Sequence, residues 1–385
     1  MKNIILTALI LIILSINLYS QDTKPDSTEV KTSLFKDPLD NKVDLSKWLM
    51  QAAGFVPLVQ IVTEPSLGYF GGIAAPIFIQ PNKPAREGGY APPNLTVGMA
   101  GYTANNTWAL GAMRIVHNQK LGLRYRYGAA YANINMDFYK DIPHLGEKKF
   151  SFNFRTIPFY GNILKEIGHT HLFAGVEYIF ASTDVKPVVE SEHLSEIIKD
   201  KDFNSTISTV GTILQYDHRD NIFTPNNGLY AELDFRMSDS WTGSDYDFRN
   251  MHIVIFKYFQ PTQKWVSGYR FDGEFLFGND APFYVHPGIN LRGVPMARYQ
   301  GMQAYTVETE QRYDFTMRWS GVVFGGLAKA IDENSTFKDE TLVYNYGVGF
   351  RYLISRLFGM RMGMDFGWSN NDFGYYITFG SAWKR

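Results

Sequence analysis

The sequence predicts an all-β fold, a transmembrane antiparallel β-barrel of sixteen strands. Its strand-like segments alternate apolar and polar residues over about 9 to 13 positions, which suits tilted membrane strands better than soluble strands of ~5–6 residues. The chain has 29 Phe, 24 Tyr, 7 Trp and 34 Gly, and it has no cysteine. Beyond residue 20, no apolar run is long enough to cross a bilayer as a helix. A secreted β-sandwich is the alternative, because its strands show the same alternation.

Residues 1–20 are predicted to be a secretory signal peptide that is cleaved near Ser20. A basic Lys2 precedes an apolar stretch from Ile4 to Leu18, which is shorter than the ~20 residues of a spanning helix. A membrane anchor is the alternative interpretation, whereas a lipid anchor is excluded because there is no cysteine. We therefore expect an exported protein.

Residues 21–54 are predicted to be an N-terminal extension, too short for a second domain of ordinary size. Its first half, QDTKPDSTEVK, is polar and is expected to lack fixed structure. Its second half is expected to contain a short helix, capped by Asp44 or Ser46 and ended by Gly54.

Residues 55–385 are predicted to form the barrel. The expected strands are 55–62, 68–80, 94–104, 107–117, 120–134, 148–163, 170–184, 206–218, 228–240, 246–260, 263–278, 304–317, 319–330, 341–353, 358–369 and 373–383. An even number suits a single-chain barrel with both ends in the periplasm. The long connections are expected outside the cell, at 135–147, 185–205, 279–303 and 331–340. Most connections at the other end are short, although the segment 81–93 breaks this pattern.

Each expected strand has one apolar face and one polar face. In the segment 346–352, for example, Tyr346, Val348 and Phe350 lie opposite Arg351. Facing lipid at mid-depth, each Arg or Lys would cost ~2–4 kcal/mol, so the charged face is expected to line a wet lumen. The charges on this face are Arg124, Arg126, Glu232, Asp234, Arg270, Asp272 and Glu274.

The first and last strands are predicted to meet at a weak lateral seam. Pro57 in the first strand has no N–H for a ladder, so this strand should pair poorly with the last. The last strand, DFGYYITFGSAW, resembles the signal by which the outer-membrane assembly machinery selects clients, through Asp372, Gly374, Ile377 and Phe379. In this strand, Tyr375, Ile377, Phe379 and Trp383 are expected to face lipid.

Four segments together resemble the C-terminal barrel of the BamA/TamA superfamily, also called bacterial surface antigen proteins. They are YDHRDNIFTPNNGLY at 216–230, LRGVPMARYQG at 291–301, VETEQRYDF at 307–315 and YGVGFRYLISRLFGMRMGMDFGW at 346–368. The segment 37–72 looks like a barrel-only branch of the superfamily, without the periplasmic POTRA domains that receive clients. Each motif is weak alone, and their order gives the resemblance its weight.

The resemblance implies a sixth extracellular loop that folds back into the lumen and is anchored there by Arg292 of an Arg-Gly motif. Arginine contacts carboxylates bidentately, and Gly293 permits close approach of the backbone. The family's wall acid on strand twelve matches Glu310, with Glu308 on the same face. The family's aspartate on strand thirteen is absent, because Gly326 stands at that position. We expect the anchor to be incomplete there, or Asp365 to serve instead.

The expected location is the bacterial outer membrane, with outer-membrane lipids as partners. The first functional hypothesis is a factor in, or accessory to, outer-membrane protein assembly or translocation, which acts on unfolded barrel clients or with other assembly proteins through the seam. The alternative is a passive or gated pore. A lipid-acting enzyme is disfavoured, because no catalytic cluster can be placed, and neither a cofactor nor a metal site is expected. The net charge of -1 gives no basic surface for nucleic acid.

Overall fold

The structure is a computed structural model that describes residues 34–51, 56–63, 65–80, 82, 93–142, 145–168, 170–188, 197–278, 280–333 and 335–383. The predicted signal peptide, the polar first half of the extension and nearly all of 81–93 lie outside these residues. Within the described residues, no helix is both long and apolar enough to span a membrane.

One antiparallel sheet contains all the named strands, and each strand pairs with its neighbours in sequence. The strands are β1 (Val56–Val62), β2 (Gly71–Gln80), β3 (Asn94–Thr103), β4 (Trp108–Asn118), β5 (Leu123–Ile142), β6 (Gly146–Glu166), β7 (Leu172–Pro187), β8 (Asn204–Asp217), β9 (Gly228–Ser238), β10 (Phe248–Thr262), β11 (Trp265–Phe277), β12 (Gln303–Asp314), β13 (Trp319–Ile331), β14 (Val343–Ser355), β15 (Met360–Ser369) and β16 (Phe373–Phe379). The helices are α2 (Ser46–Gln51), η1 (Pro65–Leu67), η3 (Asp200–Phe203), η4 (Ser240–Thr242) and η5 (Phe283–Val285). The predicted all-β antiparallel architecture is thereby confirmed.

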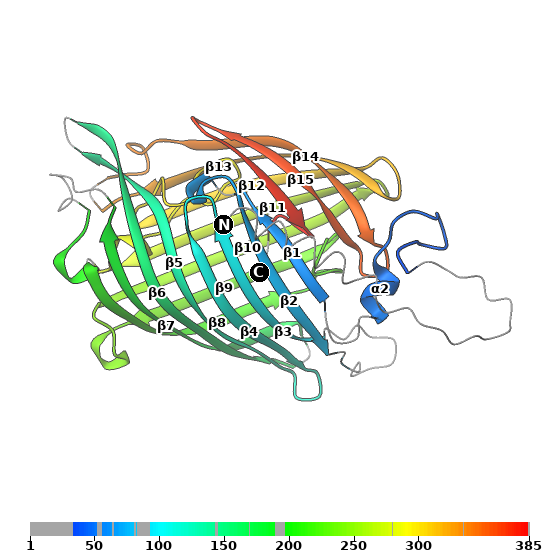
Figure 1. Ribbon diagram of the computed structural model, residues 1–385, viewed down its shortest axis with the longest axis horizontal. Coiled ribbons are helices and arrows are strands. Elements are labelled where there is room, and N and C mark those ends of the chain that lie inside the picture. Colours follow the sequence, from blue (N-terminus) through cyan, green and yellow to red (C-terminus); the bar gives the residue numbers. More distant parts are fainter. Residues whose placement is uncertain are drawn as a thin grey trace, which may run out of the picture.

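The sheet curls around on itself, so that its two edge strands, β1 and β16, come close together (Figure 1). Within the described residues, no ladder of backbone hydrogen bonds joins β1 to β16. Beside the gap, the Tyr375 hydroxyl of β16 donates to the carbonyl of Tyr69, in the turn between β1 and β2, at 2.8 Å. The curled sheet therefore has a lateral seam between two edges that are adjacent and unpaired.

The two faces of the strands differ as the alternation predicts. On β14, Tyr346 and Val348 on the convex face are 56% and 50% exposed, whereas Arg351 on the concave face is 2% exposed. We call the concave side the interior. Its charged residues are buried because strands, loops and the chain terminus fill the space around them; they include Glu232, Asp234, Arg270, Glu308 and Asp365.

The predicted long connection at 135–147 is wrong. Instead, β5 and β6 continue as a paired hairpin up to Ile142 and Gly146. The reason is a buried aromatic cluster in which Phe138 and Phe152 each contact Phe283 of η5, with ring centroids 4.9 Å apart. The two strands therefore continue as a paired ladder beyond the barrel wall, because the loop that contains η5 buries these side chains.

Candidate functional site

The candidate site lies on the loop between β11 and β12, which returns into the interior. At its base, Gly288 and Gln300 form an isolated bridge, and the Ile289 amide donates to the Tyr299 carbonyl at 3.0 Å. At its tip, the Val294 amide donates to the Leu291 carbonyl, which makes a tight turn. We call residues 278–302 the inner loop.

Gly293 occupies the tip because no side chain fits there. Its φ of +91° lies in the left-handed region, and an added Cβ would stand 2.8 Å from the Gly367 backbone of β15. In turn, a Cβ on Gly367 would stand 3.0 Å from the Arg292 carbonyl. Two glycines thus allow the loop backbone to lie directly against the wall.

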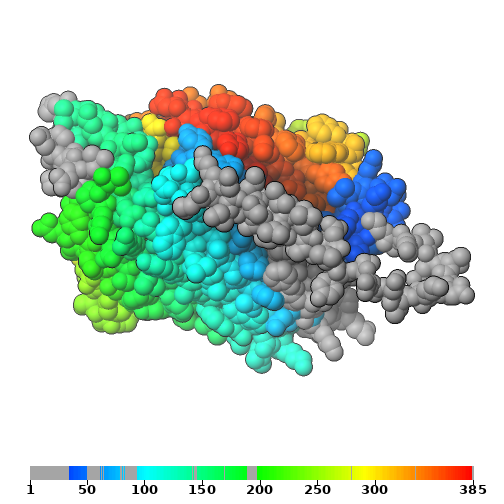
Figure 2. Space-filling view, in the orientation of Figure 1, coloured from blue at the N-terminus to red at the C-terminus, as the bar shows by residue number. Residues whose placement is uncertain are grey.

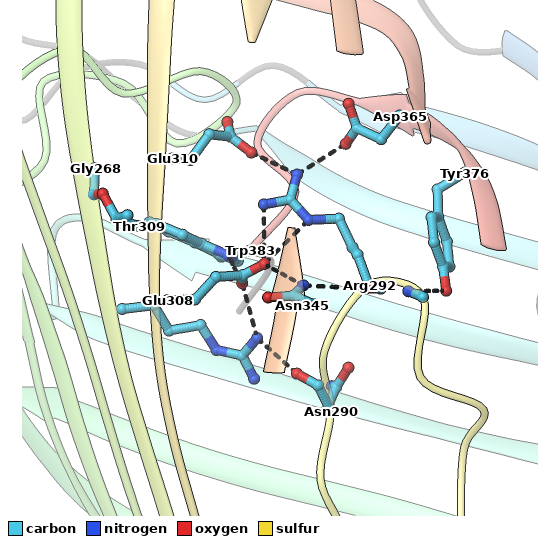
Figure 3. A network of polar contacts seen from close by, with 12 residues as sticks. Gly268, Asn290, Arg292, Glu308, Thr309, Glu310, Asn345, Asp365, Tyr376 and Trp383 are labelled. Carbon is cyan, nitrogen blue, oxygen red and sulfur yellow. Dashed lines mark hydrogen bonds and ion pairs between the residues drawn. The ribbon is translucent and has the colours of Figure 1, made fainter. Parts of the chain in front are cut away.

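Arg292 projects from this turn into a cage of carboxylates (Figure 3). Its Nη1 lies 2.6 Å from Glu310 and 2.9 Å from Asp365, and its Nη2 lies 3.0 Å from Glu308. The guanidinium also stacks 3.5 Å above the centroid of the Phe324 ring. The structure therefore brings together all four residues that the sequence predicts for the loop anchor.

Asp365 on β15 provides the second wall acid, as the sequence analysis allowed. Gly326 could not carry an acid here, because a Cβ at this position would lie 2.7 Å from the Val307 carbonyl and 3.0 Å from the Leu291 side chain. Gly326 leaves room for the inner loop, and the carboxylate is supplied instead by Asp365 on β15, two strands beyond β13 in the sheet.

Two further arginines balance the charge of this cluster. Arg351 holds both oxygens of Asp365, at 2.5 and 2.9 Å. Arg270 lies 3.4 Å from Glu308 and 2.7 Å from Asp272. Buried carboxylates need such partners, because an unpaired charge in a low-dielectric interior is strongly unfavourable.

The sequence prediction that Trp383 faces lipid at the seam is wrong. Its side chain is buried in the interior, and its Nε1 donates to Glu308 at 2.6 Å. The last strand ends at Phe379 rather than 383, and Gly380, with φ of +76°, turns the chain inward. There Trp383 packs against Phe256 and Tyr258, over Gly268, whose missing side chain provides the space.

The other predicted seam residues remain on the edge strands. Gly374, Ile377 and Phe379 pair with Gly367, Met364 and Met362 of β15. Pro57 lies in β1 opposite Pro76 of β2. The structure thus places these residues on the two edge strands that border the seam, while Trp383 belongs to the Arg292 cluster.

The structure also shows anchors of the inner loop that the sequence analysis missed. The Gly293 amide donates to the Tyr376 hydroxyl at 2.8 Å, and Arg298 contacts both Asp372 and Glu147, the latter at 3.0 Å. Tyr376 alternates with the outward-facing residues of β16, so its inward direction was readable from the sequence, whereas its partner was not.

Within the described residues, no three His, Asp or Glu side chains are grouped as metal ligands would be.

Comparison with known proteins gives structural likeness without sequence likeness. No family model matches this chain, and no curated protein matches it. BamA from Haemophilus ducreyi lacking POTRA domains 1–3 is similar in structure, with a TM-score of 0.58 and 11% identity over 84% of this chain and 69% of that chain. CdiB from Acinetobacter baumannii has a TM-score of 0.54 and 10% identity over 85% of this chain and 59% of that chain. These likenesses confirm a BamA-like β-barrel fold.

Proposed function

We propose that this chain is an outer-membrane barrel that acts in, or is accessory to, the assembly or translocation of other outer-membrane proteins. It acts by binding and by opening the lateral seam between β1 and β16, without covalent chemistry. Its partners are then outer-membrane lipids, unfolded barrel clients and other assembly proteins. The observation that carries the proposal is the pair of adjacent strand edges without a ladder.

Free strand edges are a chemical reason to expect clients. An edge strand presents unpaired N–H and C=O groups, and an extended segment of another chain can add to it as a new strand. Elsewhere in the sheet each strand is paired on both sides, from β2 to β15. The Arg292 cluster supports the same interpretation, because it ties the inner loop to β12 and β15 and leaves the seam as the weakest line of the wall.

A reversible lock across the seam tests the proposal. The natural chain has no cysteine, so Phe70→Cys and Tyr375→Cys can be joined by a cleavable bis-maleimide linker. Phe70 follows Tyr69 directly, and Tyr375 is the donor of the contact with Tyr69, which the linker replaces. We expect the lock to reduce the amount of other folded barrels in the outer-membrane proteome, and cleavage of the linker to restore it.

The matched control is a lock within a paired ladder. Tyr346 and Trp368 face each other across β14 and β15, with ring centroids 6.0 Å apart, and both are exposed. Linking cysteines at these positions should leave the proteome unchanged. An unchanged proteome with the seam locked, or in cells without the gene, would contradict the assembly role.

A passive or gated pore is the second candidate, because a barrel of about sixteen strands encloses an aqueous channel unless it is plugged. The filled interior around Arg292 and Trp383 speaks against an open pore. An intact proteome combined with altered solute uptake in the deletion strain would favour the pore.

A further inference from the structure

The first described residues form a separate unit at one end of the barrel. A bridge between Lys36 and Val43 closes a short hairpin, and α2 follows it directly. We call residues 34–51 the strap. Figure 1 shows the strap, in blue, beside the ends of the orange strands.

An ion cluster seats the strap on the barrel. Arg318, in the turn between β12 and β13, lies 2.6 Å from each of Asp37, Asp40 and Asp44. Arg356, in the turn between β14 and β15, lies 2.5 Å from Asp37. Within the strap, these contacts engage all three carboxylates with barrel arginines.

The outer surface of the strap is therefore basic and apolar. Lys36 and Lys42 are exposed, and their acidic neighbours in the sequence point into the ion cluster. Phe35, Leu39 and Val43 are 49%, 69% and 55% exposed. Exposed apolar side chains beside exposed cations are the composition of a surface that lies in a membrane interface.

This surface continues the lipid-facing wall of the barrel. The hydroxyl of Tyr352, on the convex face of β14, donates to the Val43 carbonyl at 2.9 Å. Trp319 packs edge-on against Tyr352 with ring centroids 5.0 Å apart. Tryptophan and tyrosine gather where a membrane protein crosses from hydrocarbon to headgroups. Exposed Phe315, Met317 and Leu357 in the adjacent turns extend the same surface. In the space-filling view, the blue strap borders the orange strands directly (Figure 2).

We propose that the strap is an interfacial anchor that binds anionic phospholipid in the periplasmic leaflet beside β13 and β14. Leu39 and Val43 enter the boundary between headgroups and acyl chains, and Lys36 and Lys42 pair with lipid phosphates. The periplasmic leaflet is assigned because the short connections 315–318 and 356–359 lie at this end. The inference rests on the membrane location in the proposed function and is independent of the assembly role.

Single cysteines in the cysteine-free chain test this placement. Leu39→Cys carries an environment-sensitive nitrobenzoxadiazole label in the full chain, reconstituted in vesicles of phosphatidylcholine with or without phosphatidylglycerol. Val348→Cys, on the lipid-facing wall, and Lys338→Cys, in the β13–β14 connection, are the lipid-exposed and water-exposed references. We expect the Leu39 label to be quenched by spin-labelled lipid, like the wall reference, and to be protected from aqueous iodide.

The basic residues give a second readout. A basic side chain near an anionic surface contributes roughly a factor of five to binding, so protection should increase with phosphatidylglycerol. Lys36→Gln with Lys42→Gln should remove this dependence without changing the folded, heat-resistant mobility of the barrel. Iodide quenching equal to that of the water reference would overturn the proposal. A label that is shielded in native membranes and open to iodide in vesicles would also overturn it, in favour of a protein partner. Neither result depends on whether the seam lock affects other barrels.

Discussion

At the scale of single residues, Arg292 is tightly constrained: three carboxylates and one aromatic ring meet at its guanidinium. Removing it leaves Glu308 and Asp365 buried with fewer counter-charges. Breaking a buried ion pair on one side costs about 3–5 kcal/mol, whereas an exposed pair contributes ~0–1 kcal/mol.

We therefore expect Arg292→Ala to lower the temperature at which the folded band disappears in semi-native electrophoresis. Arg249→Ala, which breaks ion pairs of a partly exposed side chain, should change it little. Equal melting of the two variants would show that the inner loop is not anchored by Arg292.

Gly326 provides a second prediction at this scale. Gly326→Ala places a Cβ 2.7 Å from the Val307 carbonyl, and overpacking of this kind costs about 1–3 kcal/mol. The neighbouring Gly325→Ala meets its nearest atom at an ordinary 3.4 Å and is the matched control. Unfolding in denaturant should distinguish the two, and greater loss in the Gly325 variant would refute the packing argument.

The Trp383 side chain both packs in the interior and donates a hydrogen bond, whereas a phenylalanine could only pack. Trp383→Phe keeps the ring among Phe256 and Tyr258 but removes the donor to Glu308, a charge-assisted bond worth about 1.5–3 kcal/mol. Trp368→Phe, on the convex face, is the control. We expect the Trp383 variant alone to lower the free energy of unfolding by this amount, measured from denaturant curves; an unchanged free energy would mean that the bond to Glu308 contributes nothing.

At the scale of elements, the strap is joined to the barrel by ionic contacts, which makes its seating dependent on pH. The hydrogen bond from Arg356, together with Arg318, lowers the pKa of Asp37 from 3.8 to about 2. A carboxyl whose folded pKa is depressed stabilises the docked state above its unfolded pKa, and this contribution is lost as pH falls through the folded value.

Acidification from pH 4 towards pH 2 should accordingly release the strap. The distance between spin labels on Leu39 of the strap and Leu357 of the barrel would follow the release, and Asp37→Asn should lower the stability of docking already at neutral pH and flatten the transition. A distance that stays unchanged throughout this range would contradict ionic seating by Asp37.

At the scale of the whole molecule, the inner loop and the inward-turned chain end occupy the interior that the wall encloses. Deleting residues 282–300 should convert a poorly conducting barrel into an open channel, measured in planar bilayers. Deletion of 335–340, in the connection between β13 and β14, controls for loss of loop residues in general. Heat-resistant mobility would first establish that each deleted barrel is folded; unchanged conductance in a folded barrel would show that the loop does not block the lumen.

The sequence by itself determined the features that depend on local periodicity. Because side chains alternate along a strand, it predicted which residues of β14 face outward and that Glu308 and Glu310 share the face that Arg292 reaches. It also indicated Asp365 as a substitute for the acid that Gly326 lacks.

The tertiary structure alone decided the contacts between residues far apart in the chain. Alternation continues past Phe379, so it could not show that Gly380 turns Trp383 inward to Glu308. The aspartates of the strap are likewise unremarkable in sequence, and their partner Arg318 lies 281 residues along the chain from Asp37. Such pairs form only when the sheet curls and brings its far strands together, because the distance between them is set by the path of the whole wall and not by local propensity.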